Sequence, residues 1–129
     1  MIIRFLPMTL VMAIIFFLSH TPGQDLPSTI SGLDKVLHAI AYGTLAASCL
    51  YGMQPAAGEQ KSWRIGMATV FFCFFYGLTD EFHQSFIPGR FPSWLDIAAD
   101  TAGAALTVLV WHWWRTRRFS RRGKALDIG

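Results

Sequence analysis

Apolar residues in this chain run in long blocks rather than alternating with polar residues. The blocks are apolar on all sides of a helix, whereas a helix on the surface of a soluble domain would keep one polar face. A membrane-spanning helix needs about 20 residues, at 1.5 Å per residue, to cross a hydrocarbon core of roughly 30 Å. Residues 5–24 and 36–58 contain no formal charge and are long enough to span. The pattern therefore predicts an integral membrane protein.

The third and fourth apolar blocks are too short to span by themselves. Residues 65–79 and 101–114 reach only roughly 21 to 23 Å as helix. To cross the bilayer, the third helix must therefore include Asp80 and Glu81, and the fourth must include at least Asp100. Because lipid offers the backbone no hydrogen-bond partners, we expect an all-α bundle of four transmembrane helices. The expected spans cover about 3–19, 36–54, 65–86 and 95–114.

Basic residues are distributed unevenly around the four expected helices. Of the 11 lysines and arginines, six follow the last span, one precedes the first, and two lie between the second and third. Only Lys35 and Arg90 fall in the other two connections. By the positive-inside rule both termini are expected in the cytoplasm, with residues 115–129 as a basic cytoplasmic tail. The connections around residues 19–35 and 84–94 are expected to face outward.

Composition narrows the classes of partner. The chain has 129 residues, of which 53% are hydrophobic and 15% charged, with a net charge of +3. Basic residues directly after a span are ordinary topology determinants that also favour anionic lipid headgroups, so the bilayer is the expected partner and nucleic acid is not. Cys49 and Cys73 fall within expected spans without a C-x-x-C arrangement, which favours a packing role. "FFLSHTPGQ" has no small-x-small cleavage site of a signal peptide.

Ionisable side chains gather toward the outer ends of three expected helices. Asp34, His38 and Tyr42 are spaced by four residues, which places them on one face of the second helix. Asp96 and Asp100 share a face of the fourth helix in the same way. Charges exposed to lipid would cost a few kcal/mol or more, so these groups should face one another or a wet cavity. Acidic groups exceed basic ones, and some carboxylates are therefore expected to keep a proton at neutral pH.

Structural explanations of the same residues remain open. Arg90 could pair with Glu81 or Asp96 merely to fix helix packing, and His38 could simply hydrogen-bond Asp34 or a carboxylate of the last helix. His83 is expected outside the cluster, because it lies about 200° around the helix from Glu81. His38, His83, Glu81 and Asp96 carry metal-binding atoms, but the chain has no H-E-x-x-H or similar spacing, so neither a metal nor a cofactor is expected.

Three segments resemble the motif blocks of the VanZ-like family of membrane proteins. They are "DKVLHAIAYGTL" at 34–45, "TDEFHQSFIPGR" at 79–90 and "SWLDIAADTAG" at 93–103, and "SHTP" at 19–22 is similar to a Ser-x-x-Pro often found there. The resemblance implies a four-helix transmembrane domain over residues 1–114 in a bacterial cytoplasmic membrane. It also implies a link to resistance against the glycopeptide antibiotic teicoplanin, with which the family's namesake is associated. The chain departs from the family pattern with Asp100 in place of Asn and Thr107 in place of Gly.

The motif positions define the candidate binding site. Its members are Asp34, Lys35, His38, Tyr42, Glu81, Gln84, Arg90, Ser93, Asp96 and Asp100, and Gly103 completes the last motif. The family assigns these residues no roles. Glu81, Asp96 and His38 are the candidates for catalysis, because carboxylates and imidazoles are the usual general acids and bases.

Three hypotheses of function follow. In the first, an outward polar pocket binds a cell-envelope component or an amphiphilic antibiotic. In the second, an enzyme uses Glu81 or Asp96 as general acid or base on a lipid-linked cell-wall precursor, while Arg90 and Lys35 hold an anionic headgroup. In the third, which ranks lowest because no inverted repeat is visible, Asp100, Glu81 and His38 relay protons in a carrier. The sequence does not specify an oligomeric state.

Overall fold

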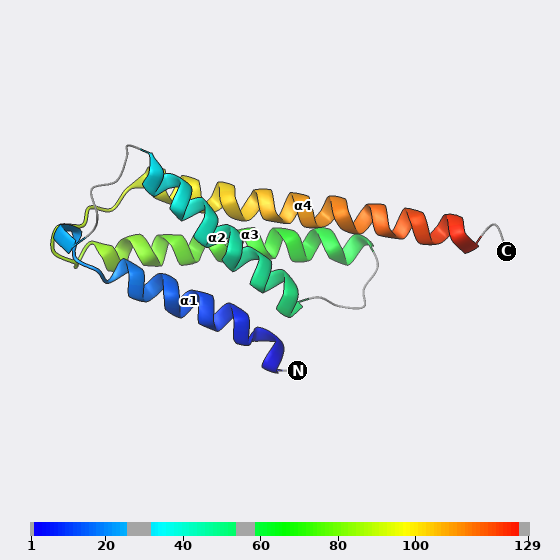
Figure 1. The fold of residues 1–129 in the computed structure, drawn as a ribbon, viewed down its shortest axis with the longest axis horizontal. Helices are drawn as coiled ribbons and strands as arrows, with labels where there is room; N and C mark the ends of the chain where they lie inside the picture. Colours follow the sequence, from blue (N-terminus) through cyan, green and yellow to red (C-terminus); the bar gives the residue numbers. More distant parts are fainter. Residues whose placement is uncertain (1, 26–31, 54–58, 127–129) are drawn as a thin grey trace.

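Four α-helices form the part of the protein that the structure describes. The structure, a computed structural model, describes residues 2–25, 32–53 and 59–126. Within these ranges there is no strand, and the element order is η1 (Ile2–Phe5), α1 (Leu6–Ser19), η2 (Gly23–Asp25), α2 (Leu33–Met53), α3 (Glu59–Gln84) and α4 (Trp94–Leu126), as Figure 1 shows. The predicted all-α four-helix fold is confirmed.

The helix ends follow from local sequence. Pro7 lies in the first turn of α1, where a missing N–H costs no hydrogen bond. The main-chain carbonyl of Ser93 starts α4 by accepting from the amides of Asp96 at 3.1 Å and Ile97 at 3.3 Å. Between α3 and α4, Gly89 has φ +75°, a left-handed conformation that favours glycine. These boundaries fix where the polar residues of each helix begin and end.

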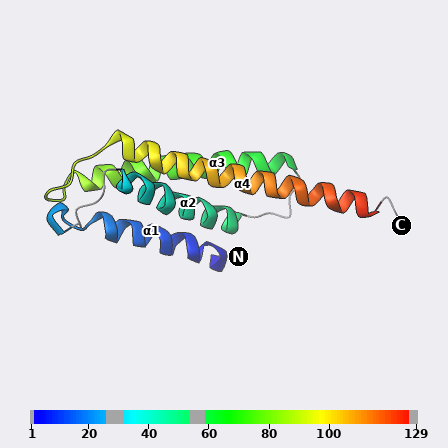
Figure 2. The same ribbon diagram turned by 45° about the horizontal axis from the view of Figure 1, so that its top comes forward.

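Helix α2 lies at the centre of the packing. It contacts α4 most extensively and also contacts α1 and α3, and Figure 2 shows it between α1 and α4. A Cβ placed on Gly103 would fall on the backbone of Ala39, so glycine at this position lets α4 approach α2 closely. The core that results combines residues from all four helices: Ile15, Tyr42, Leu45, Ala46, Cys49, Cys73 and Ala104. Cys49 and Cys73 are free and buried, as a packing role requires.

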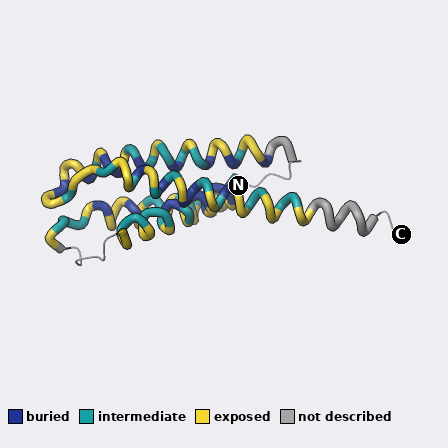
Figure 3. The backbone as a smooth tube through the Cα atoms, turned by 90° about the horizontal axis from the view of Figure 1, so that it is seen from above, coloured by how far each residue is buried: buried dark blue, intermediate teal, exposed yellow. Residues whose placement is uncertain are grey.

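The outer surface of the bundle is apolar. Figure 3 shows buried positions of the helices facing one another and exposed positions on the outside. Three stretches are long and apolar enough to cross a membrane, Leu33–Met53, Ser62–Gln84 and Trp94–Arg118, and they correspond to the second, third and fourth expected spans. The first expected span, residues 3–19, is not among these three stretches. It corresponds to a shorter apolar helix, Ile3–Ser19, whose α-helical part α1 has 14 residues and a length of about 21 Å.

The segment expected as a separate basic tail continues α4 as helix to Leu126, and residues 127–129 lie outside the described part. Where it leaves the apolar region, arginines cover tryptophans. The guanidinium of Arg117 lies 4.1 Å from the ring centroid of Trp113, and that of Arg118 lies 4.1 Å from that of Trp114. Such cation–π pairs suit a membrane interface, where one side of the aromatic ring is wet.

The two ends of the bundle are chemically different. The start of α1 and the end of α4 lie toward one end, and the turns after Ser19 and Gln84 lie at the other (Figure 1). Residues 26–31 of the first turn and residue 54, the end of the second expected span, fall outside the described residues. The clustering of basic residues near the first end predicts that this end is cytoplasmic.

A reporter fused after Gly129 should therefore lie in the cytoplasm. Green fluorescent protein should fluoresce there, and alkaline phosphatase should be inactive. The same pair of reporters inserted after Gly89 should give the opposite pattern. An active phosphatase at the C-terminus would show that the bundle has the opposite orientation, with the polar residues described next at the cytoplasmic face.

Candidate functional site

The candidate residues meet where the two turns come together. The amide of Gly23 in η2 donates to the carbonyl of Pro88 at 3.0 Å, which joins the end of α1 to the turn between α3 and α4. A Cβ on Gly23 would fall on the backbone of Gly89, so these two backbone segments touch without side chains between them. This contact holds Arg90 beside the end of α1 and the start of α2, where it lines one pocket with Ser19 and Asp34.

Lys35 joins α2 to α4. Its Nζ atom lies 2.6 Å from Oδ2 of Asp34 and 2.5 Å from Oδ1 of Asp96. The pairing of Arg90 with Glu81 or Asp96 that the sequence left open is not found among the described residues, since Lys35 binds Asp96 and no carboxylate lies within ion-pair distance of Arg90. Lys35, not Arg90, therefore neutralises part of the acidic cluster.

His38 and Asp100 form the second link between α2 and α4. Nδ1 of His38 lies 2.9 Å from Oδ1 of Asp100, and this carboxylate is completely buried. Gly77 lets α3 approach, because a Cβ there would be 3.1 Å from Oδ2 of Asp100. That oxygen and the hydroxyl of Tyr42 are buried without a hydrogen-bond partner among the described residues. Of the two partners considered for His38, Asp34 and a carboxylate of the last helix, the structure contains the second.

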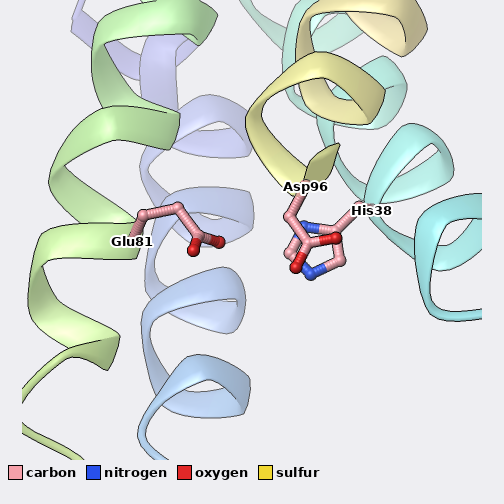
Figure 4. A group of neighbouring side chains, drawn as sticks. All are labelled: His38, Glu81 and Asp96. Carbon is pink, nitrogen blue, oxygen red and sulfur yellow. The ribbon is translucent and has the colours of Figure 1, made fainter. Parts of the chain in front are cut away.

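Glu81 comes from α3 and faces the same space. Only 3% of the residue is exposed, and its Oε2 accepts a hydrogen bond of 2.6 Å from the main-chain amide of Ser93. Its Oε1 is buried and has no partner in the described part of the chain. Figure 4 shows the Glu81 carboxylate pointing from α3 toward Asp96 and His38. Ser93, one of the candidate residues, thus contributes its backbone amide to the site.

Asp80 belongs to a separate hydrogen-bond network between α1 and α3. Its Oδ2 accepts from the hydroxyl of Ser19 at 2.8 Å and from Nε2 of Gln84 at 3.0 Å. Ser19 was not among the candidate residues, although its place in "SHTP" marked it. His83 lies apart as expected, because its ring stacks on Phe16 with centroids 4.5 Å apart.

A pocket of about 290 Å³ opens between α1, α2, α3 and the turn that carries Arg90. One part of its wall is apolar, with Ile15, Leu18, Leu37 and Ala41. The other part is polar, with Ser19, Thr21, Asp34, His38, Tyr42, Asp80 and Arg90. Nε of Arg90 is buried and has no hydrogen-bond partner among the described residues. Because Arg90 also has no carboxylate partner in the described part of the chain, its guanidinium can pair with an anion bound in the pocket.

The predicted residues thus divide into two adjoining groups. Asp34, His38, Tyr42 and Arg90 line the pocket, and Gln84 supports Asp80 on its α1 side. Lys35, Glu81, Asp96 and Asp100 lie between α2, α3 and α4, with His38 shared by both groups. Acid–base chemistry, anion binding and cation binding are all within reach of such a set of atoms.

Comparison with known proteins gives one match. A family model described as VanZ/LLP1 matches residues 4–115, which include every helix up to the middle of α4 and all of the candidate residues. No curated protein matches the chain. No solved structure matches it.

Proposed function

Because the chain belongs to the VanZ/LLP1 family, we propose that it is a membrane protein that binds an amphiphile of the cell envelope in the pocket between α1, α2 and α3. The headgroup lies against the polar wall, and the apolar part extends into the lipid. In this proposal the pocket faces outward in a bacterial cytoplasmic membrane. The family's association with teicoplanin resistance favours an occupant that is either a lipid-linked cell-wall component or the antibiotic itself.

The charges in the pocket favour an anionic headgroup. Both carboxylates of the wall already have donors, since Asp34 pairs with Lys35 and Asp80 accepts from Ser19 and Gln84. The observation that carries the proposal is that Arg90 lines the pocket and has no carboxylate within ion-pair distance among the described residues. A guanidinium binds phosphate or carboxylate through two parallel hydrogen bonds, and such charge-assisted bonds are about twice as strong as neutral ones.

The apolar wall favours an amphiphile over a small soluble anion. Leu18 and Leu37 line the pocket and are also 63% and 53% exposed on the bundle surface. The pocket wall is therefore continuous with the surface that the proposal places in lipid. A molecule with an acyl or polyprenyl chain could keep the chain in the bilayer while its headgroup reaches Arg90, so binding would not require the apolar part to leave the membrane.

Filling the pocket should prevent retention of the ligand. Ala41 lines the pocket, and Ala41→Phe adds a ring inside it, whereas Ala47→Phe places the same ring on the exposed side of α2. Native mass spectrometry of protein released from nanodiscs made with bacterial lipid extract should show a retained amphiphile on the wild type and on Ala47→Phe. We expect at least a tenfold lower retained fraction on Ala41→Phe. Equal retention by the two variants would exclude this pocket.

A second candidate function is acid–base catalysis on the same class of ligand. The free Oε1 of buried Glu81, beside an imidazole already oriented by Asp100, favours it. Glu81→Gln would then retain the amphiphile but leave it unconverted, and the wild type would yield a product of different mass. If wild-type protein and Glu81→Gln carry the same unaltered molecule after incubation with lipid extract, the chain acts by binding alone.

A further inference from the structure

We propose that His38, Glu81 and Asp96 bind a divalent transition-metal ion, for which Zn²⁺ is the best match. One donor atom from each residue lies within 4.8 Å of the others, although the three come from α2, α3 and α4 (Figure 4). This site adjoins the amphiphile pocket through His38 but does not depend on its occupancy. The sequence contains no local metal motif because each ligand lies on a different helix.

His38 and Glu81 each keep one donor atom free, whereas Oδ1 of Asp96 is bound by Lys35. Nδ1 of His38 is bound to Asp100, which leaves Nε2 as the ring nitrogen available to a metal. A histidine held by a carboxylate through its other nitrogen is the usual arrangement around metal ions, since it fixes the ring and raises its basicity. Only 3% of Glu81 is exposed. One of its carboxylate oxygens accepts a hydrogen bond from the amide of Ser93, and the other has no partner among the described residues.

The local charge also favours a cation. Glu81, Asp96 and Asp100 gather in the space between the helices, with Asp34 at its edge, and Lys35 is the lysine that lies among them. Buried carboxylates in proteins are paired, protonated or bound to metal ions, because desolvation of an uncompensated charge is expensive. A divalent ion would offset most of the excess that Lys35 leaves.

The donor set selects the metal. One imidazole and two carboxylates suit Zn²⁺, which accepts nitrogen and oxygen ligands and, in sites with three protein ligands, keeps a further position for water or a bound molecule. Ligands around tetrahedral Zn²⁺ lie roughly 3.3 Å apart when the bonds are about 2.0 to 2.1 Å. Binding would therefore draw together donors that now lie within 4.8 Å of one another, chiefly by rotation of the Glu81 side chain, whose Oε1 has no other partner.

Zinc binding by tag-free protein in detergent tests the proposal. After chelator treatment and dialysis, the wild type should bind one Zn²⁺ per chain saturably, with a higher Tm, and Co²⁺ should give visible absorption bands of a low-coordinate site. His38→Ala and Glu81→Gln should each weaken the affinity by more than tenfold. Asp100→Asn, which keeps the shape but weakens the support of His38, should weaken it by about 10- to 100-fold.

A matched control separates the site from nonspecific binding by histidine. His112→Ala removes a histidine near the middle of α4 that lies outside the cluster, with its Nδ1 3.4 Å from the hydroxyl of Ser62. This variant should bind Zn²⁺ like the wild type. The proposal is overturned if the wild type binds no stoichiometric Zn²⁺, or if folded Glu81→Gln and His38→Ala bind it as tightly as the wild type. Because wild-type stoichiometry and the Co²⁺ spectrum need no variant, misfolding of the variants would not prevent a decision.

Discussion

Arg90→Ala should lower the affinity for an anionic amphiphile by at least about tenfold. A hydrogen bond between charged partners contributes about 1.5 to 3 kcal/mol, and 1.4 kcal/mol corresponds to a factor of ten in affinity. The guanidinium lines the pocket with its Nε unpartnered, so its removal breaks no interaction within the described protein. The measurement is titration of nanodisc-embedded protein with a lipid-linked phosphate, followed by native mass spectrometry.

Two further variants test whether the expected loss of affinity is specific to the Arg90 guanidinium. Arg90→Lys keeps the charge but cannot form two parallel hydrogen bonds, so its affinity should lie between those of the wild type and Arg90→Ala. Arg64→Ala removes an exposed arginine near the start of α3 and should leave the affinity unchanged. If Arg90→Ala binds as tightly as Arg64→Ala, the occupant is not held by this guanidinium, and the charge argument for an anionic headgroup fails.

Gly103→Ala should destabilise the bundle by up to about 2 kcal/mol. The added Cβ would fall on the backbone of Ala39, which cannot rotate away, so α2 and α4 must separate. Overpacking of a core usually costs about 1 to 3 kcal/mol, and the higher intrinsic helix propensity of alanine offsets only about 1 kcal/mol of the cost. Separation of α2 from α4 would also move Lys35 and His38 away from Asp96 and Asp100. The Tm in detergent, by circular dichroism, measures the effect.

Gly66→Ala is the matched control. Its added Cβ would meet only Cγ1 of Val108, a side-chain methyl, whereas the Cβ at Gly103 would meet backbone. We expect Gly66→Ala to lower the Tm less than Gly103→Ala does, because a side chain shifts more easily than a helix backbone. A Gly103→Ala variant as stable as Gly66→Ala would mean that α4 does not need glycine to approach α2.

The fold and the location of the site could be predicted from the sequence because both follow from short-range rules. Apolar blocks separated by charges determine four helices, and a spacing of four residues places Asp34, His38 and Tyr42 on one face. Segment length was also a useful signal, since Asp80, Glu81 and Asp100 all lie buried in the bundle. The motif order that indicated a VanZ-like protein agrees with the family match over residues 4–115.

The pairing of side chains between helices could not be predicted in the same way. Lys35 and Arg90 were equivalent cations in the sequence, and only the crossing of α2 with α4 decides that Lys35 meets Asp96. Asp80 and Glu81 are neighbours in the chain, yet the rotation of about 100° between successive residues turns Asp80 toward Ser19 on α1 and Glu81 toward Ser93. Helix register and crossing depend on the packed small residues, and no local pattern encodes them.

The point at which α4 ends also could not be predicted from the sequence. The basic segment was expected as a tail beyond the membrane, and its charges gave no reason to end the helix at Trp114. Helix propensity accounts for the continuation past the aromatic side chains, because arginine, lysine and alanine favour helix and no glycine lies between Gly103 and Gly123. The helix passes through Gly123 and ends at Leu126.

Photo-crosslinking from inside the pocket tests the central proposal most directly. A photoreactive amino acid at position 37, which lines the pocket, is compared with one at position 109, which is exposed on α4 away from it. After irradiation of intact bacterial membranes, mass spectrometry of the adducts should show an anionic envelope amphiphile at position 37 that disappears with Arg90→Ala, and only bulk phospholipid at position 109. The same bulk phospholipid at both positions, unaffected by Arg90→Ala, would contradict a binding pocket.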